Sequence, residues 1–124
     1  IIYPELLYGR DALVGVALFL SHLALEGLSM TQLRESYPSY FMSKNKIQLT
    51  DGVDADAILT AMEKLYADYP VKTIDGVWID LGKEWVHLRK SNTEPIIRIY
   101  TESDDQDKAN NLAMKVMDQI KSLS

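Results

Sequence analysis

The sequence predicts an α+β fold, a small antiparallel sheet with two helices on one of its faces. Short stretches between residues 44 and 101 alternate polar and apolar side chains, which is typical of half-buried strands. Two longer stretches have apolar residues at helical spacing, one early in this region and one after it. The dipeptide Asp75-Gly76 is a strong hairpin signal between two of the strands, so antiparallel pairing is expected.

Composition limits the classes of protein to which this chain can belong. Its 124 residues suffice for one compact domain, or for one small domain and a piece of another. The net charge of −5 argues against nonspecific binding of nucleic acid, and the lack of cysteine excludes disulfides and thiolate metal sites. No apolar run approaches the roughly 20 residues that span a membrane. The chain opens with IIYPELLYG, without an initiator Met or the layout of a signal peptide, so we expect a piece of a longer protein.

The first predicted element is a helix over residues 9–27, GRDALVGVALFLSHLALEG. Asp11 is the expected N-cap, and Gly27 is the expected residue just past the C-terminal end. Apolar side chains lie on nearly all sides of this helix, and such a helix is normally buried on several sides. The rest of the chain offers too little surface to cover it, which indicates that its partner belongs to another domain.

A short second helix and a break follow. Ser29 and Gln32 have the spacing of a capping box, and Pro38 interrupts the chain after this helix. We therefore predict a boundary here, with residues 1–38 as the C-terminal helical piece of one domain and residues 39–124 as a complete small domain.

The second segment contains the strands and the two amphipathic helices. Strands are expected at 44–49, on both sides of Asp75-Gly76, at 84–89 and at 96–101. Asp54 is the expected N-cap of the first helix, and the aspartates at 104, 105 and 107 favour the start of the last one. The predicted buried stripes consist of Ile58, Ala61, Met62, Leu65 and Tyr69 in the first helix and of Ala109, Leu112, Ala113, Val116, Met117 and Ile120 in the second.

Between the last two strands lies KSNTEP, residues 90–95, which is longer than the two-residue turn that joins many antiparallel strands. Ser91, Asn92 and Thr93 bring side-chain donors, and a bend at Asn92 is expected to point successive backbone N–H groups inward, as an anion-binding nest does. Arg89 offers a planar fork that suits two oxygens of one phosphate. Ser, Asn and Thr are also common turn formers, and Arg89 can be a solvated strand-end charge, so both interpretations stand at this point.

The neighbours of these residues have expected supporting roles. Lys90 adds positive potential, while Glu94 is expected to point away from an anion and to hold a donor in place. His87 shares a strand face with Arg89 and can adjoin the site, although a packing or surface role is the simpler interpretation. Arg98 either braces the loop or contacts phosphate directly.

The stretch RKSNTEPIIRIYTES, residues 89–103, resembles the C-terminal signature of the α-D-phosphohexomutases, the superfamily of phosphomannomutase, phosphoglucomutase and phosphoglucosamine mutase. The family pattern is Arg, any residue, Ser, Gly or Asn, Thr, Glu and Pro, followed by a strand with a further Arg. DGVWIDLGKEWVHLR is similar to the two strands that lead to this loop, and YPELLYGRDALVGVALFL to the last helix of the family's third domain. The matching residues are Arg89, Ser91, Asn92, Thr93, Glu94, Pro95 and Arg98, and the departure is Lys90, where many relatives have Pro or a small residue.

The resemblance implies a four-domain enzyme that interconverts hexose 1-phosphates and hexose 6-phosphates. A phosphoserine in the first domain donates the phosphoryl group, aspartates in the second hold Mg²⁺, and a loop in the third recognises the sugar. The fourth, a TATA-binding-protein-like α+β unit, clamps the phosphate that does not react. The resemblance assigns residues 39–124 to that unit, with phosphate bound by Arg89, Ser91, Asn92 and Thr93 and supported by Lys90, Glu94 and Arg98.

The same resemblance has implications for the chain alone. It contains neither the family's phosphoserine motif nor its metal loop, so by itself it is expected to be inactive, with no catalytic residue and no cofactor. The expected partners are a phosphosugar and the remaining domains of the same chain, not nucleic acid or a membrane, and the expected location is cytoplasmic. Whether the hexose is mannose, glucose or glucosamine stays open, because the loop of the third domain recognises it.

Two other functions fit parts of the sequence. A stand-alone anion-sensing module without catalysis would share the loop, but the apolar first helix argues against it. A small α+β RNA-binding domain would need exposed aromatic residues and a basic surface, and the net charge of −5 disfavours it. A metal site is also disfavoured, because the two histidines lack ligand spacing and the acidic residues at 102–107 suit a helix start better than Ca²⁺.

Overall fold

The computed structural model describes residues 1–50 and 52–123 of the chain. Contacts within the chain divide it into two compact units, Ile1–Pro38 and Ser39–Ser124. That these units belong to two different domains of a longer enzyme stays a prediction.

The first unit contains two capped helices, α1 (Ala12–Glu26) and α2 (Met30–Ser36). The Asp11 carboxylate accepts the backbone N–H of Val14 at 3.1 Å, and Gly27 ends α1 with a left-handed φ of 64°. Ser29 and Gln32 form a complete capping box at the start of α2. The caps of both helices are therefore those that the sequence predicts.

None of the residues of α1 is buried, although the helix is apolar on nearly all sides. Leu13 is 81% exposed and Leu25 is 86% exposed, so large apolar side chains are uncovered near both ends of the helix. Within the described residues, no single helix has the length and apolar composition to cross a membrane, and α1 and α2 pass that test only as a pair bent by 88°. This unit therefore retains the uncovered apolar surface that its sequence predicts.

The second unit is built on one five-stranded antiparallel sheet with the strand order β1-β5-β4-β3-β2. Gly76 takes a φ of 74° in the turn between β2 and β3, in agreement with the hairpin signal at this position. The strands are β1 (Phe41–Gln48), β2 (Val71–Lys72), β3 (Val77–Asp80), β4 (Trp85–Lys90) and β5 (Ile96–Ser103).

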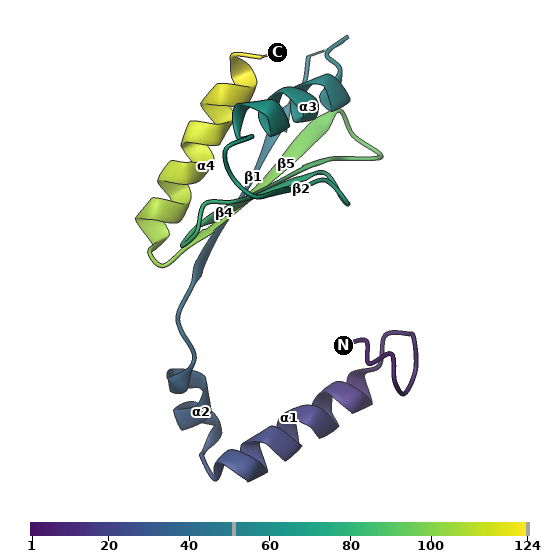
Figure 1. Ribbon diagram of the computed structural model, residues 1–124, viewed down its shortest axis with the longest axis vertical. Helices are drawn as coiled ribbons and strands as arrows, with labels where there is room; N and C mark the ends of the chain where they lie inside the picture. Colours follow the sequence, from purple (N-terminus) through teal and green to yellow (C-terminus); the bar gives the residue numbers. More distant parts are fainter. Residues whose placement is uncertain (51, 124) are drawn as a thin grey trace. The chain divides into compact units, whose positions relative to one another are not determined.

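Two helices, α3 (Ala55–Leu65) and α4 (Gln106–Lys121), cover one face of the sheet, as Figure 1 shows. Asp54 caps α3 by accepting the backbone N–H of Asp56, and Asp105 caps α4 by accepting those of Asp107 and Lys108. The hydrophobic core lies between these helices and the sheet, and its fully buried members include Met62, Ile79, Leu88, Ile97, Ile99 and Ile120. The predicted α+β fold, with both helices on one face of an antiparallel sheet, is confirmed.

The buried stripe of α3 differs in part from the predicted one. Met62 is buried as predicted, but Leu65 is 56% exposed and Tyr69 is 49% exposed. The helix ends at Leu65, so the helical spacing does not extend to Tyr69. Tyr66 takes the inner position instead: its side chain is buried, and its hydroxyl donates to Gln119 Oε1 at 2.8 Å.

Among the described residues of this unit, no helix lies on the opposite face of the sheet, which presents the polar half of each alternating strand. In β4, Val86 and Leu88 are buried on the helix side, whereas His87 and Arg89 alternate with them and lie on the other side. The predicted shared face of His87 and Arg89 is therefore confirmed. This face and the loop that follows β4 position the candidate site.

Candidate anion-binding site

The loop between β4 and β5 is fixed to two neighbouring strands. The Ser91 N–H donates to the Ile96 carbonyl at 3.0 Å, which closes the base of the hairpin. The Pro95 carbonyl accepts the backbone N–H of Leu49 at 2.8 Å and the side-chain amide of Gln48 at 3.1 Å. Because these bonds join the loop to the end of β1 as well as to β5, its backbone is held in place before any ligand binds.

A pocket of about 200 Å³ opens at this loop. That volume is below the roughly 300–1,000 Å³ of typical small-molecule sites, so it suits one phosphate group better than a whole phosphosugar. Glu94 is not among the described residues that line the pocket, and the direction of its carboxylate stays a prediction. The pocket brings together the other predicted site residues, Arg89, Lys90, Ser91, Asn92, Thr93 and Arg98.

The loop backbone offers N–H donors. In the described part of the chain only glycines have a positive φ, so Asn92 is not left-handed, and the anion-binding nest stays a prediction. The Thr93 N–H donates to the Ser91 hydroxyl at 3.4 Å. Within residues 1–50 and 52–123, the N–H groups of Asn92 and Glu94 donate to no acceptor, which leaves both of them for a ligand.

Arg89 is contacted by the turn between β2 and β3. An Asp75 carboxylate oxygen lies 3.1 Å from Arg89 Nε, and both side chains are exposed. His87 Nε2 lies 2.6 Å from the Asp75 carbonyl oxygen, so the tautomer protonated at Nε2 donates to it. Gly76 permits this close approach, because a Cβ there would come 2.1 Å from the Leu88 carbonyl oxygen. An exposed ion pair contributes only about 0.2–1 kcal/mol to stability, so the main consequence of this contact is the orientation of Arg89.

Lys90 and Arg98 differ in their partners. The Lys90 amine pairs with the Asp56 carboxylate in the first turn of α3, on the helix side of the sheet. Arg98 lies directly opposite Arg89 in the register of β4 and β5, and it forms no ion pair within the described residues. Arg89 and Lys90 thus each have a carboxylate partner, Asp75 and Asp56 respectively. The sequence analysis missed both partners because they are distant along the chain.

The acidic residues after β5 form a helix start. The Asp105 carboxylate accepts the N–H groups of Asp107 and Lys108 at 2.9 and 3.0 Å. The hydrogen bond from Lys108 to Asp104, at 2.8 Å, holds the pKa of Asp104 below its ordinary value. Among the residues that the structure describes, no three His, Asp or Glu side chains gather in an arrangement that could hold a metal ion.

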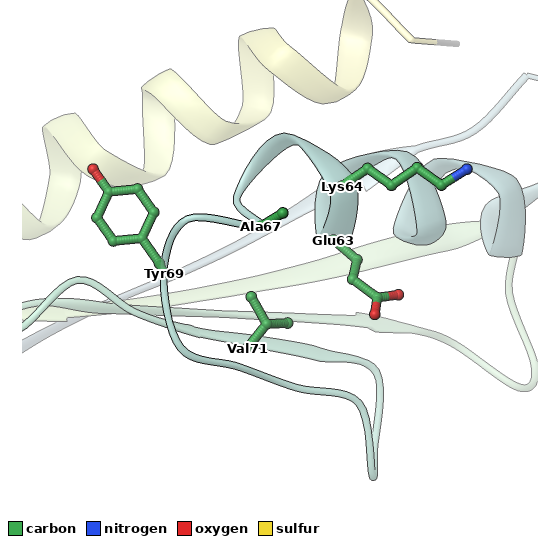
Figure 2. A pocket seen from close by; sticks show the side chains of 5 residues that line it. All are labelled: Glu63, Lys64, Ala67, Tyr69 and Val71. Atoms are coloured by element: carbon green, nitrogen blue, oxygen red, sulfur yellow. The ribbon is translucent and has the colours of Figure 1, made fainter.

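A larger pocket, of about 430 Å³, lies beside the end of α3 and β2 (Figure 2). Figure 2 shows that its side chains project in different directions, with the Lys64 amine pointing away from Tyr69 and the Glu63 carboxylate pointing towards the strands. An anion would find no converging donors here, so the loop pocket is the better candidate site. The side chains drawn are Glu63, Lys64, Ala67, Tyr69 and Val71.

Comparison with known proteins identifies relatives of the chain. Residues 46–119 match the family model of the phosphoglucomutase/phosphomannomutase C-terminal domain. The chain is 42% identical over 113 residues to a phosphoglucosamine/phosphogalactosamine mutase of Sulfurisphaera tokodaii, a match that covers 89% of this chain and 25% of that protein. It is 32% identical over 111 residues to a phosphoglucomutase/phosphomannomutase of Thermococcus kodakarensis, with coverages of 88% and 24%.

A third relative is a probable phosphoglucosamine mutase of Methanopyrus kandleri, 28% identical over 123 residues, which covers 97% of this chain and 27% of that protein. The chain thus spans about a quarter of the length of the curated relatives that it matches. All the residues that line the loop pocket lie inside the range 46–119 that matches the family model.

Proposed function

This chain belongs to the phosphoglucomutase/phosphomannomutase family and contains its C-terminal domain, and from this premise we propose that the loop after β4 clamps the phosphate of a hexose phosphate. Arg89, Ser91, Asn92 and Thr93 bind the phosphate that does not react, while Lys90, Glu94 and Arg98 support them. The parent enzyme interconverts a hexose 1-phosphate and a hexose 6-phosphate through a bisphosphate intermediate.

The observation that supports this proposal most strongly is the pocket of about 200 Å³, which gathers several donors that have no acceptor within the described residues. The Asp75 contact is to Arg89 Nε, and the terminal amino groups of Arg89 donate to no acceptor in the described part of the chain. These groups, the hydroxyls of Ser91 and Thr93 and the free loop N–H groups are the donors that phosphate oxygens accept most strongly. Together they form a clamp for one tetrahedral anion.

A clamp of this kind fits the proposed reaction. The bisphosphate must reverse its orientation between the two phosphoryl transfers, so each end of the sugar presents its phosphate to the same clamp in turn. The loop therefore has to bind phosphate firmly while making no contact that depends on the sugar carbon to which it is attached. A clamp on a separate domain of the parent enzyme can also release its ligand when that domain moves away from the others.

The remaining chemistry belongs to other parts of the parent chain. We place the phosphoserine, the sugar-recognising loop and the Mg²⁺ ligands there, and Mg²⁺ when bound supplies charge stabilisation to the transferred group. The residues of this chain bind and orient the substrate, and the chain alone is expected to be inactive. Its proposed location is cytoplasmic, and its proposed partners are a phosphosugar and the other domains of the same chain.

Titration of the isotope-labelled chain with inorganic phosphate, followed by NMR, tests the clamp. We expect a dissociation constant on the order of 1 mM, because water competes with phosphate for an open site. Chemical-shift changes should centre on residues 89–93 and on Arg98. Arg89→Gln should weaken binding by about tenfold or more, since it removes a charge-assisted donor.

Arg10→Gln is the matched control, because it removes the same charge from the first unit. Its affinity for phosphate should equal that of the unchanged chain. Shifts centred away from the loop, or equal affinities for Arg89→Gln and Arg10→Gln, would refute the proposed clamp.

A further inference from the structure

A row of three cations crosses the sheet on the face that carries no helix of this unit. Lys46 of β1 lies directly opposite Arg98 of β5, and Arg98 lies directly opposite Arg89 of β4. Their neighbours Ile47 and Ile97 are buried on the helix side, so alternation places the three cations together on the other face. Like charges directly opposite each other destabilise a sheet, which means that this row favours the binding of an anion.

The distribution of carboxylates shows where the positive charge is uncompensated. Arg89 pairs with Asp75, and Lys90 pairs with Asp56, so the two cations of the loop signature are each neutralised by a neighbour. Lys46 and Arg98 form no ion pair and no side-chain hydrogen bond within residues 1–50 and 52–123. The net positive charge beside the pocket therefore comes from these two residues rather than from the loop.

We propose that Lys46 is a further phosphate-binding residue, and that Lys46 and Arg98 together supply the charge that selects a dianionic phosphate monoester. This inference rests on the proposed clamp, because it adds a residue to the same site. Neighbouring strands lie about 4.8 Å apart, a separation that an extended lysine side chain spans, so the Lys46 amine can reach an anion bound against Arg98.

The two groups of residues then have different tasks. Arg89, oriented by Asp75, and the loop donors fix the position of the phosphate oxygens through hydrogen bonds. Lys46 and Arg98 balance the charge of a monoester whose second pKa is about 6 and which is therefore dianionic at neutral pH. A monoanionic ester of similar shape, such as a sulfate ester, would leave one of these two cations uncompensated and should bind more weakly.

Two lysine-to-glutamine variants of the full chain test the role of Lys46. Lys46→Gln removes a charge from the row, whereas Lys44→Gln removes the same charge two residues away on the same strand and face, opposite Tyr100. We expect Lys46→Gln to weaken the binding of inorganic phosphate by about fivefold to tenfold, and Lys44→Gln by less than about twofold. Lys46→Arg, which keeps the charge, should retain most of the affinity.

Two further readouts separate a binding role from a structural one. Without phosphate, Lys46→Gln should unfold at a temperature no lower than Lys44→Gln does, because the like-charge row is relieved. Lys46→Gln should also reduce the preference for glucose 6-phosphate over glucose 6-sulfate, and Lys44→Gln should preserve it. An Lys46→Gln variant that is less stable but binds phosphate as well as Lys44→Gln would overturn the inference.

The outcomes also distinguish this inference from the proposed clamp. If Arg89→Gln loses phosphate binding and Lys46→Gln matches Lys44→Gln, the clamp stands and the role of Lys46 is refuted. If the unchanged chain binds no phosphate at this loop, both the clamp and the role of Lys46 are refuted.

Discussion

Replacing Gly76 by alanine tests how the turn between β2 and β3 holds Arg89. The φ of 74° at Gly76 costs a residue with a Cβ about 1–2 kcal/mol. The new Cβ would also lie 2.1 Å from the Leu88 carbonyl oxygen and 3.1 Å from Arg89 Cγ. The first of these atoms is backbone and cannot rotate away, so the turn must move, at a further cost of about 1–3 kcal/mol. The free energy of unfolding should therefore fall by about 2–5 kcal/mol in total.

Gly82→Ala provides the matched control, because Gly82 has a φ of 90° but no atom within 4 Å of an added Cβ. Urea unfolding should show a loss of only about 1–2 kcal/mol for this variant. Phosphate titration should show weaker binding for Gly76→Ala, since the moved turn takes Asp75 away from Arg89, and unchanged binding for Gly82→Ala. Equal losses of stability in the two variants, with equal phosphate affinities, would refute this account of the turn.

The other predictions concern the parent enzyme, the first unit and the helix start of α4. In the full-length mutase, Arg89→Ala should lower kcat/KM by roughly tenfold to several hundredfold with the hexose 1-phosphate and the hexose 6-phosphate alike. An unchanged kcat/KM for both substrates would contradict the clamp. A chain that begins at Ser39 should unfold at the same urea concentration as the second unit of the full chain, because that unit has its own core; loss of the folded state would show that the predicted boundary is wrong. Because the pKa of Asp104 is lowered in the folded chain, its contribution to stability is present above the pKa of the unfolded chain and is lost as the pH falls through the folded pKa. Asp104→Asn should therefore make the free energy of unfolding depend less on pH in the acid range. An unchanged pH dependence would contradict this.

Local features of the fold could be predicted from the sequence because they depend on a few adjacent residues. Asp11, Asp54 and the Ser29–Gln32 box cap their helices through bonds that span two or three residues. The exposed Tyr69 shows the limit of this reasoning, because α3 ends at Leu65. Periodicity predicts which residues share a helix face, but it does not predict where the chain leaves the helix.

The charges of the candidate site depend on distant contacts, and for that reason the sequence revealed only part of them. The signature placed Arg89 and Lys90 side by side, yet one pairs with Asp75 and the other with Asp56 on the opposite side of the sheet. Lys46 was missed because only the register of β1 against β5 brings it opposite Arg98. The alternation in KNKIQL indicates that Lys46 lies on a polar face, but no local rule gives its cross-strand neighbour.

The central claim is that one fixed loop binds the phosphate of a hexose phosphate whichever carbon bears it. NMR titration of the chain with glucose 1-phosphate and with glucose 6-phosphate tests this claim most directly. The account predicts affinities that agree within about threefold, since a loop that contacts only phosphate makes the same bonds to both ligands, and shifts centred on residues 89–93 in both titrations. A difference in affinity of about tenfold or more, or shifts at different residues for the two ligands, would contradict it.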